Sequence, residues 1–569
     1  MKPQPSPPSA HSEVEIVRLV WLAIFVSVFS FLFYYRHGDV QLYGDAVAHV
    51  NIARRVFDSK TPGLLQLGTV WLPLPHLLII PFIVSKQMWQ TGLGGPIPSM
   101  AGFVLGVLGI FRLVRAVLSS NGEVDIAAKI SSWAAAILYA ANPNLIYMQA
   151  TAMGESLYLA FFIWAVMYFV EFTQGNAKTL TKCGLCVAAA CLTRYDGWFL
   201  AMALTVGAVV NFCQRKLHED GTAGSFVRPS RMVLLKFVLL ASSAPLLWLA
   251  YNAAVYQNPL EFANGPYSAK AIEQKTATVN PAKGNLLAAG SYFLKAAELN
   301  EGEANWQGRL WLALSLLGSL VAWFSRRGRV ALLLWVPLPF YSLSIAYGSV
   351  PLFVPTWWPF SQYNVRYGLQ LLPALAVFVP LAISFLCRSV GKIPRFQASW
   401  SRWTDAATFL TVAALTVTNY GAIWRADPVC YREAALNMRG RVALDGQLAG
   451  WIKSLPADST LLMYLGEHVG ALQQAGVPLR RVINEGNHRV WKRPTDPEGL
   501  WERALANPAE YADYLVGFEN DPVWTAARSG HLMALVEIHT TGQPRAAIFQ
   551  GRSQGRTQAQ TQGQVQEPN

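Results

Sequence analysis

Apolar residues along this chain gather in long runs, separated by short polar or basic segments. An α-helix rises about 1.5 Å per residue, so a run of about 20 residues crosses the roughly 30 Å hydrocarbon core of a bilayer. The pattern predicts a polytopic α-helical membrane protein with about eleven transmembrane helices. The predicted spans lie near residues 16–35, 97–118, 127–146, 152–171, 178–193, 197–213, 232–254, 309–325, 329–347, 367–388 and 405–424.

The first apolar run and the loops between the spans predict the orientation of the chain in the membrane. The run at 16–35 is too long for a signal-peptide core and lacks a small-residue cleavage site, so we expect it to remain as the first span. The loops at 214–231, 325–329 and 388–402 are short and basic, which is typical of the cytoplasmic side. This predicts a cytoplasmic N-terminus and an extracytoplasmic C-terminus, whereas one missed span would place these three loops outside.

Three longer segments are expected on the outer side of the membrane domain, which covers residues 16–425. They are 36–96, 255–308 and 348–366. The first contains an apolar run at 77–84 that is short and interrupted by proline. We expect this run to lie at the membrane interface, because it is too short to cross comfortably.

After about residue 426 the long apolar runs stop. Helical patterns at 467–475 and 496–505 alternate there with strand-like runs, which predicts a small extracytoplasmic α/β domain over 426–550. Residues 1–15 are rich in Pro and Ser and residues 551–569 in Gln, Gly and Arg, so both ends are predicted to be disordered. The strand-like runs are 460–464, 481–484, 514–518, 532–539 and 545–549.

Composition supports a membrane protein and argues against other classes. Hydrophobic residues make up 53% of the chain and charged residues only 14%, against roughly 25% charged in soluble domains. The formal net charge of +13 does not indicate a nucleic-acid partner, because the basic residues fall largely in loops between spans. The six cysteines form no disulfide framework, and the sequence has no P-loop, nucleophile-elbow, zinc-protease or dinucleotide-binding motif.

Asp45 is the most informative candidate for chemistry. It follows Gly44 at the start of a helical pattern, just beyond the first span, where it could cap a helix or serve as a catalytic base or metal ligand facing a membrane-embedded substrate. His49 lies four residues on, on the same helical face, so the pair could share a metal or a proton network, or form an interfacial ion pair. Asp39 is either a second carboxylate of the site or a loop residue.

Other charged residues lie at the expected outer ends of spans. Glu155 begins one span. A carboxylate at this position either is a helix N-terminal acid or has a functional role at membrane depth. Arg194 and Asp196 lie in the turn between two spans and could form a local ion pair. Arg366 enters another span on the side where arginine is disfavoured, and its guanidinium suits bidentate binding of a phosphate.

Together these features resemble a known family, the GT-C-fold glycosyltransferases of the protein O-mannosyltransferase-like group, which includes the bacterial aminoarabinose transferase that modifies lipid A. The resemblance covers about residues 16–425, and it depends on the order and membrane placement of four features. These are Asp45 with a helix ending at 52–55 (Ile-Ala-Arg-Arg), the segment 71–76 (Trp-Leu-Pro-Leu-Pro-His), the segment 142–143 (Asn-Pro) with Glu155 and 192–194 (Leu-Thr-Arg), and the segment 364–367 (Asn-Val-Arg-Tyr).

The resemblance implies a bacterial inner-membrane enzyme with an extracytoplasmic active site. It implies a polyprenyl-phosphate-linked sugar as donor, a hydroxyl group on protein, lipid or glycan as acceptor, and an inverting displacement with hexose or pentose transfer. The family's catalytic aspartate maps onto Asp45, and its lipid-phosphate-binding arginine maps onto Arg366. Arg194 or a divalent metal could assist Arg366, and His49 could orient Asp45 or bind that metal.

One departure from the family leaves the acidic partner of Asp45 open. Members often carry Asp-Glu where this chain has Asp45-Ala46, so Asp39 or Glu155 could supply a second carboxylate.

Two other functions also stay open. A transporter or flippase of lipid-linked saccharides predicts ionisable residues inside spans and related halves, and a surface-polysaccharide polymerase or ligase predicts large outer loops without the Asp45 signature.

Overall fold

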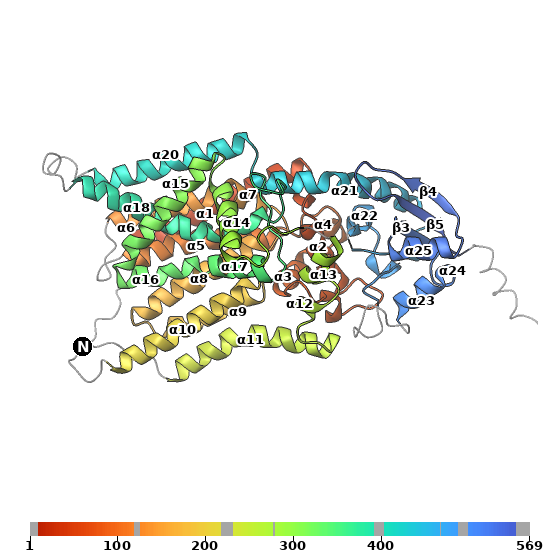
Figure 1. The fold of residues 1–569 in the computed structure, drawn as a ribbon, viewed down its shortest axis with the longest axis horizontal. Helices are drawn as coiled ribbons and strands as arrows, with labels where there is room; N and C mark the ends of the chain where they lie inside the picture. The colour runs from red at the N-terminus through yellow and green to blue at the C-terminus, as the bar shows by residue number, and fades with distance from the viewer. Residues whose placement is uncertain are drawn as a thin grey trace, which may run out of the picture.

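The computed structural model describes residues 10–118, 126–217, 231–276, 279–391, 403–466, 468–487 and 499–552. It has two parts, a bundle of long helices and a smaller domain that contains a sheet (Figure 1). The sheet domain lies at one end of the bundle, and the long helix α21 (Val429–Ser454) runs from the bundle into it.

Eight described helical segments are long and apolar enough to cross a membrane. The chain is therefore an integral, multi-pass membrane protein, while the number of eleven spans and their orientation stay predictions. The long helices of the bundle are α1 (Ala10–Arg36), α5 (Ile97–Leu118), α6 (Ile126–Ala140), α8 (Glu155–Thr173), α9 (Lys178–Cys191), α10 (Asp196–Leu217), α11 (Arg231–Tyr256), α15 (Asn305–Trp323), α18 (Leu372–Gly391) and α20 (Thr404–Arg425).

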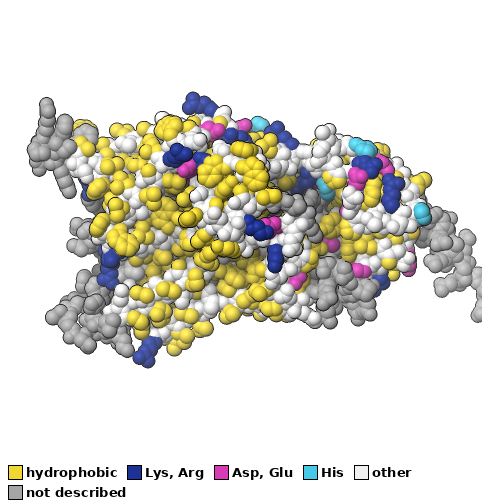
Figure 2. Space-filling view, viewed as in Figure 1, with side chains coloured by type: hydrophobic (Ala, Val, Ile, Leu, Met, Phe, Trp, Pro, Cys, Tyr) yellow, Lys and Arg dark blue, Asp and Glu magenta, His cyan; other side chains and the backbone are white. Residues whose placement is uncertain are grey.

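The outer surface of the bundle is apolar. Figure 2 shows hydrophobic side chains covering the visible face of the bundle, with charged side chains mainly near its ends and on the sheet domain. Trp21, Phe25 and Val417 are examples of large apolar residues left exposed on its helices. A soluble protein rarely exposes so wide an apolar surface, which is the surface that lipid tails would cover.

Two predicted spans are interrupted by proline. The span at 127–146 divides into α6 and the short helix α7 (Pro143–Gln149), because Pro143 has no N–H to continue α6 and the Asn142 side chain accepts hydrogen bonds from the first N–H groups of α7. The span at 329–347 is likewise built from α16 (Arg326–Ala331), a 3₁₀ turn η3 (Leu332–Trp335) and α17 (Pro337–Tyr347).

Helix α1 begins at Ala10, earlier than the expected start of the first span at residue 16, so the prediction of disorder does not hold for residues 10–15. The physical reason is that Glu15 forms ion pairs with Arg115 of α5 and Lys129 of α6, which fix the first turns of α1 against the bundle. Residues 1–9 and 553–569, the rest of the predicted disordered ends, lie outside the described residues.

The two longer predicted loops contain helices of their own. Segment 36–96 forms η1 (Asp39–Gln41), α2 (Gly44–Arg55), η2 (Leu64–Leu67), α3 (Leu74–Ile83) and α4 (Lys86–Gln90). Helix α3 has 10 residues, which is too short to cross a bilayer. Segment 255–308 contains α12 (Glu261–Asn264), α13 (Ala269–Thr276) and α14 (Leu286–Glu301).

The sheet domain has five strands in the order β2-β1-β3-β5-β4. Strands β2, β1 and β3 are parallel, and β5 and β4 are antiparallel additions. The strands β1 (Leu461–Met463), β2 (Val482–Ile483), β3 (Tyr514–Phe518), β4 (Ala534–Ile538) and β5 (Ala546–Gln550) occupy the five predicted runs, and helices α22 (Val469–Ala475), α23 (Leu500–Ala506), α24 (Pro508–Tyr511) and α25 (Pro522–Ser529) lie between them.

Segment 36–96 joins the two parts of the molecule. In α2, the Asn51 side chain donates to Gln473 Oε1 of α22 at 2.7 Å. In α4, the Gln90 side chain donates to the backbone oxygen of Gln474 at 3.0 Å. The helix that carries Asp45 therefore lies between the bundle and the sheet domain, where both can position it.

Candidate functional site

A cluster of buried charges lies where the bundle meets α21, and Arg366 is at its centre. Arg366 belongs to the 3₁₀ helix η4 (Val365–Leu371), which leads into α18. Its Nη2 lies 2.6 Å from Asp45 Oδ2, its Nε lies 3.2 Å from Glu155 Oε1, and its Nη1 lies 3.5 Å from Glu433 Oε1. One guanidinium thus connects α2, α8 and α21.

Arg194, in the turn between α9 and α10, is the second cation of the cluster. Its Nη1 donates to Glu155 Oε1 at 2.9 Å and its Nη2 to the Tyr341 hydroxyl at 2.8 Å, while its Nε lies 3.5 Å from Asp196 Oδ1. Two guanidiniums therefore share one oxygen of Glu155. The ring of Tyr367 lies near both, with its centroid 5.2 Å from Arg194 Cζ and 5.3 Å from Arg366 Cζ.

Three acids of the cluster occupy the first turns of helices. Asp45 is the second residue of α2, Glu155 the first of α8 and Asp196 the first of α10. A helix N-terminus carries partial positive charge and favours a carboxylate there. Because all three helices begin near Arg366 or Arg194, the acids converge although they are far apart in the sequence.

Asp45 is the accessible carboxylate of the Arg366 cluster. Its side chain is 37% exposed, against 1% for Glu155 and 3% for Glu433. The other two acids are buried acceptors for arginine, whereas Asp45 has one side on Arg366 and another open to a ligand. A proton can be taken from a substrate only by a group that the substrate reaches, so Asp45 is the candidate base.

Glu433, on α21, is the residue of this cluster that sequence reasoning missed. Its Oε2 accepts from the backbone N–H of Val365 at 2.7 Å, and its Oε1 accepts from the N–H of Asn364 at 3.1 Å and from the Tyr43 hydroxyl at 3.0 Å. It therefore holds the segment that carries Arg366. No local sequence pattern distinguishes this glutamate, because it lies in a charged region that the sequence predicts to be part of the C-terminal α/β domain.

His49 and Asp39 do not join the Arg366 cluster directly. His49 Nδ1 lies 2.8 Å from His76 Nε2, and its ring packs near Trp71. Burial lowers the pKa of His49, which favours a neutral imidazole over an ion pair with Asp45. Asp39 Oδ2 accepts from the Tyr431 hydroxyl at 3.2 Å, and burial raises the pKa of this carboxyl.

A divalent metal held by Asp45 and His49 would need further ligands beside them. Among them, no group of three His, Cys, Asp or Glu side chains is arranged to hold a metal ion. Asp45 instead faces the guanidinium of Arg366, and His49 directs Nδ1 to His76. A cation beside Asp45 would meet the positive charge of Arg366, so this arrangement does not fit a metal centre.

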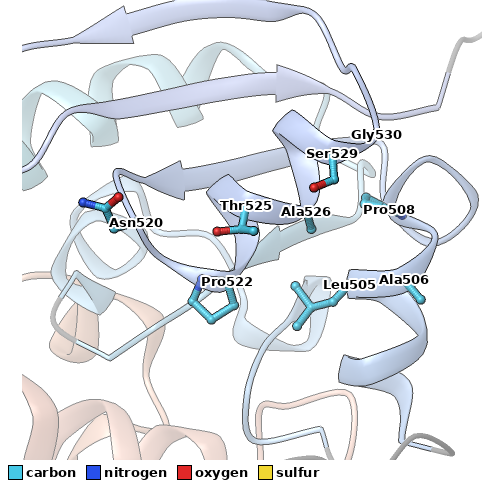
Figure 3. A pocket seen from close by; sticks show the side chains of 9 residues that line it. All are labelled: Leu505, Ala506, Pro508, Asn520, Pro522, Thr525, Ala526, Ser529 and Gly530. Atoms are coloured by element: carbon cyan, nitrogen blue, oxygen red, sulfur yellow. The ribbon is translucent and has the colours of Figure 1, made fainter.

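A separate pocket lies in the sheet domain (Figure 3). It has a volume of about 670 Å³ and is formed by residues of α23 and α25 and the segments beside them. Its lining consists of small, apolar and uncharged polar residues, among them Asn520, Thr525 and Ser529. The lining holds no acidic or basic side chain that could activate the hydroxyls of Thr525 and Ser529, so this pocket is not the candidate active site.

Comparison with known proteins identifies the fold. No protein-family model and no curated protein matches the chain. Solved structures do match: ArnT from Cupriavidus metallidurans bound to undecaprenyl phosphate has a TM-score of 0.51 and 13% identity, covering 96% of this chain and 99% of that chain. The apo form of ArnT has a TM-score of 0.52 and 12% identity, covering 95% and 98%. An oligosaccharyltransferase from Archaeoglobus fulgidus matches with a TM-score of 0.43 and 12% identity, covering 88% and 67%.

The chain is thus a multi-pass membrane protein with the GT-C fold. More particularly, its fold is that of ArnT over nearly the full length of both chains, including the sheet domain. The GT-C resemblance inferred from the four sequence features is confirmed at the level of the fold. The likeness now also covers the C-terminal domain, which the sequence resemblance did not include.

Proposed function

We propose that this protein is a membrane glycosyltransferase that moves a sugar from a polyprenyl-phosphate-linked donor to a hydroxyl acceptor. The observation that carries the proposal is Asp45, an accessible carboxylate paired with a buried arginine at one end of a GT-C bundle. Undecaprenyl phosphate, bound in one of the ArnT structures, is the model for the lipid part of the donor. In this proposal the site lies on the extracytoplasmic side of a bacterial inner membrane.

Asp45 acts as the general base in a single inverting displacement. Its carboxylate takes the proton of the acceptor hydroxyl while that oxygen attacks the anomeric carbon of the donor. The bond from the anomeric carbon to the phosphate oxygen breaks, and the lipid phosphate leaves with the bonding electrons. Glu155, Glu433 and Asp196 are buried and act through the two arginines rather than on the substrate.

Arg366, assisted by Arg194, stabilises the charge that develops on the leaving phosphate. Each guanidinium already contacts carboxylates, so a phosphate must share Arg366 with them or displace one. Asp45 is the acid that can yield its contact, because it is the exposed one. An acceptor hydroxyl that binds Asp45 would draw it away from Arg366 Nη2 and free that nitrogen for the phosphate.

The direct test is sugar transfer from a polyprenyl-phosphate sugar pool by purified protein, comparing the wild type with Asp45→Asn. We expect the variant to fold and bind donor but to lose turnover by about 10²-fold or more. Asp39→Asn is the matched control, since Asp39 lies on the same segment and bonds to Tyr431 instead of Arg366, and it should keep most of its activity. Equal activity of Asp45→Asn and wild type would remove Asp45 as the base.

The same preparation separates this function from a transporter. Protein reconstituted into vesicles that carry lipid-linked sugar should transfer sugar to an acceptor and should not speed movement of the lipid across the bilayer. Movement without transfer would favour a flippase. The buried charges cluster where the bundle meets α21, and a transporter is expected to carry such charges at the bilayer midplane instead.

A further inference from the structure

Arg441 is a buried cation beside α2, the helix that carries Asp45. The proposed mechanism does not use this arginine. It lies on α21, eight residues beyond Glu433, which is about 12 Å farther along the helix axis from the bundle. The residue is only 8% exposed, and its Nε and Nη2 are buried without a hydrogen-bond partner in the described part of the chain. A buried guanidinium with unmet donors is costly unless a ligand or water satisfies it.

The neighbour of Arg441 is the N-terminus of α2. A Cβ atom added to Gly44 would lie 2.5 Å from Arg441 Nη1, so the guanidinium approaches the first residue of the helix closely. Helix α2 has 12 residues, and its N-cap residue Tyr43 makes no side-chain capping hydrogen bond. The first N–H groups of α2 thus have no cap from the Tyr43 side chain, and an arginine lies beside the first residue of the helix, an arrangement that suits an oxyanion.

Among the described residues, no carboxylate lies within ion-pair distance of Arg441, in contrast to Arg366 and Arg194. Asp445, one turn along α21 from Arg441, has its Oδ1 3.1 Å from His468 Nδ1 instead. Both arginines of the Arg366 cluster are already paired with carboxylates, and the donor phosphate of the proposed mechanism must share them. Arg441 is the cation near Asp45 whose charge is left for a ligand.

We propose that Arg441 and the N-terminus of α2 bind an oxyanion, a phosphate or carboxylate, that belongs to the acceptor. The inference depends on the proposed glycosyltransferase function, and it makes the acceptor an anionic hydroxyl compound. The phosphate of the donor is the other source of such a group. Arg441 favours the acceptor because it lies about 12 Å beyond Glu433 along α21. Helix α21 runs away from the bundle (Figure 1), whereas a lipid tail must lie against the bundle.

The test measures binding of inorganic phosphate and of undecaprenyl phosphate to the full-length protein in detergent at constant ionic strength. Arg441→Gln removes the charge, and Gly44→Ala keeps every charge but fills the space beside Nη1. Arg439→Gln is the matched control, an exposed arginine two residues away on the same helix. We expect Arg441→Gln and Gly44→Ala to weaken inorganic phosphate binding by about 10-fold or more, and the control to change it by less than about 2-fold.

Undecaprenyl phosphate should bind wild type and Arg441→Gln equally. An equal loss of both ligands would assign Arg441 to the donor and overturn the proposal, as would phosphate binding that is absent or insensitive to Arg441→Gln. If Arg441→Gln fails to fold, phosphate binding by Gly44→Ala tests the proposal instead. Because these measurements need no sugar transfer, an inactive protein that still binds phosphate through Arg441 would refute the proposed function and leave the anion site in place.

Discussion

Glu433 offers a sharp test of how the sheet domain supports the site. Replacing it with glutamine keeps the shape of the side chain but removes one acceptor oxygen and the negative charge. The oxygen of the amide can face Asn364, Tyr43 and Arg366, and the NH₂ group must then face the backbone N–H of Val365, which donates to Glu433 Oε2 at 2.7 Å. Two donors cannot bond to each other, so the substitution leaves a buried N–H without a partner.

The magnitude follows from burial. The side chain of Glu433 is 3% exposed and that of Arg366 9%, so water does not replace the lost contact. A buried unsatisfied donor costs about 1–3 kcal/mol, and breaking a buried ion pair costs about 3–5 kcal/mol in all. Because Asp45 and Glu155 still compensate Arg366, we expect a loss of about 3 kcal/mol of folding stability, near the lower end of that range.

The assay is thermal or denaturant unfolding of the purified protein in detergent, with sugar transfer measured in parallel. Glu303→Gln is the control, since Glu303 pairs with Arg432, the residue next to Glu433, at 2.8 Å. Its side chain is 34% exposed, so its loss should cost less than about 1 kcal/mol. If the two variants unfold alike, Glu433 does not hold the Arg366 segment and the reasoning is wrong.

Three further predictions concern stability of the same purified protein. Burial raises the pKa of Glu301, at the end of α14, to about 8, so the native carboxyl keeps a proton that the unfolded chain releases above about pH 4.5. Stability should therefore fall as the pH rises between those values, and Glu301→Gln should flatten this dependence in melting curves. Gly102→Ala places a Cβ 2.7 Å from Leu157 Cα and should lower the melting temperature, whereas Gly421→Ala, with no atom within 4 Å, should not. Asp521→Ala removes the N-cap of α25, whose Oδ1 accepts from the N–H of Trp524, and should cost about 1 kcal/mol in denaturant unfolding, while Asp521→Asn keeps the cap.

Much of the fold was predictable because it depends on local patterns. Runs of about 20 apolar residues have few alternatives to membrane helices, and the five short strands of the sheet domain appear as separate apolar runs. The interruptions were harder to predict. The break between α6 and α7 depends on Asn142 capping a helix that begins at Pro143, and hydropathy does not detect a cap inside an apolar run.

The site was predictable only in part. Asp45, Glu155, Arg194 and Arg366 stand out because charges at span ends are unusual, and the structure places them together. Glu433 did not stand out, because its role depends on a contact with Arg366 across 67 residues of sequence. His49 illustrates the opposite case: its spacing from Asp45 suggested a shared ligand, but tertiary packing pairs it with His76.

The position of α21 suggests why a membrane domain of this kind carries a C-terminal domain. Glu433, near the start of α21, fixes the backbone that carries Arg366, and Arg441, farther along, approaches the start of α2. Asp45 lies between these two contacts, on a short helix that also bonds to α22 through Asn51. A short helix outside the bilayer has little stability of its own. The sheet domain therefore supplies the packing that holds the accessible carboxylate against the bundle, so the proposed base is positioned by both parts of the molecule.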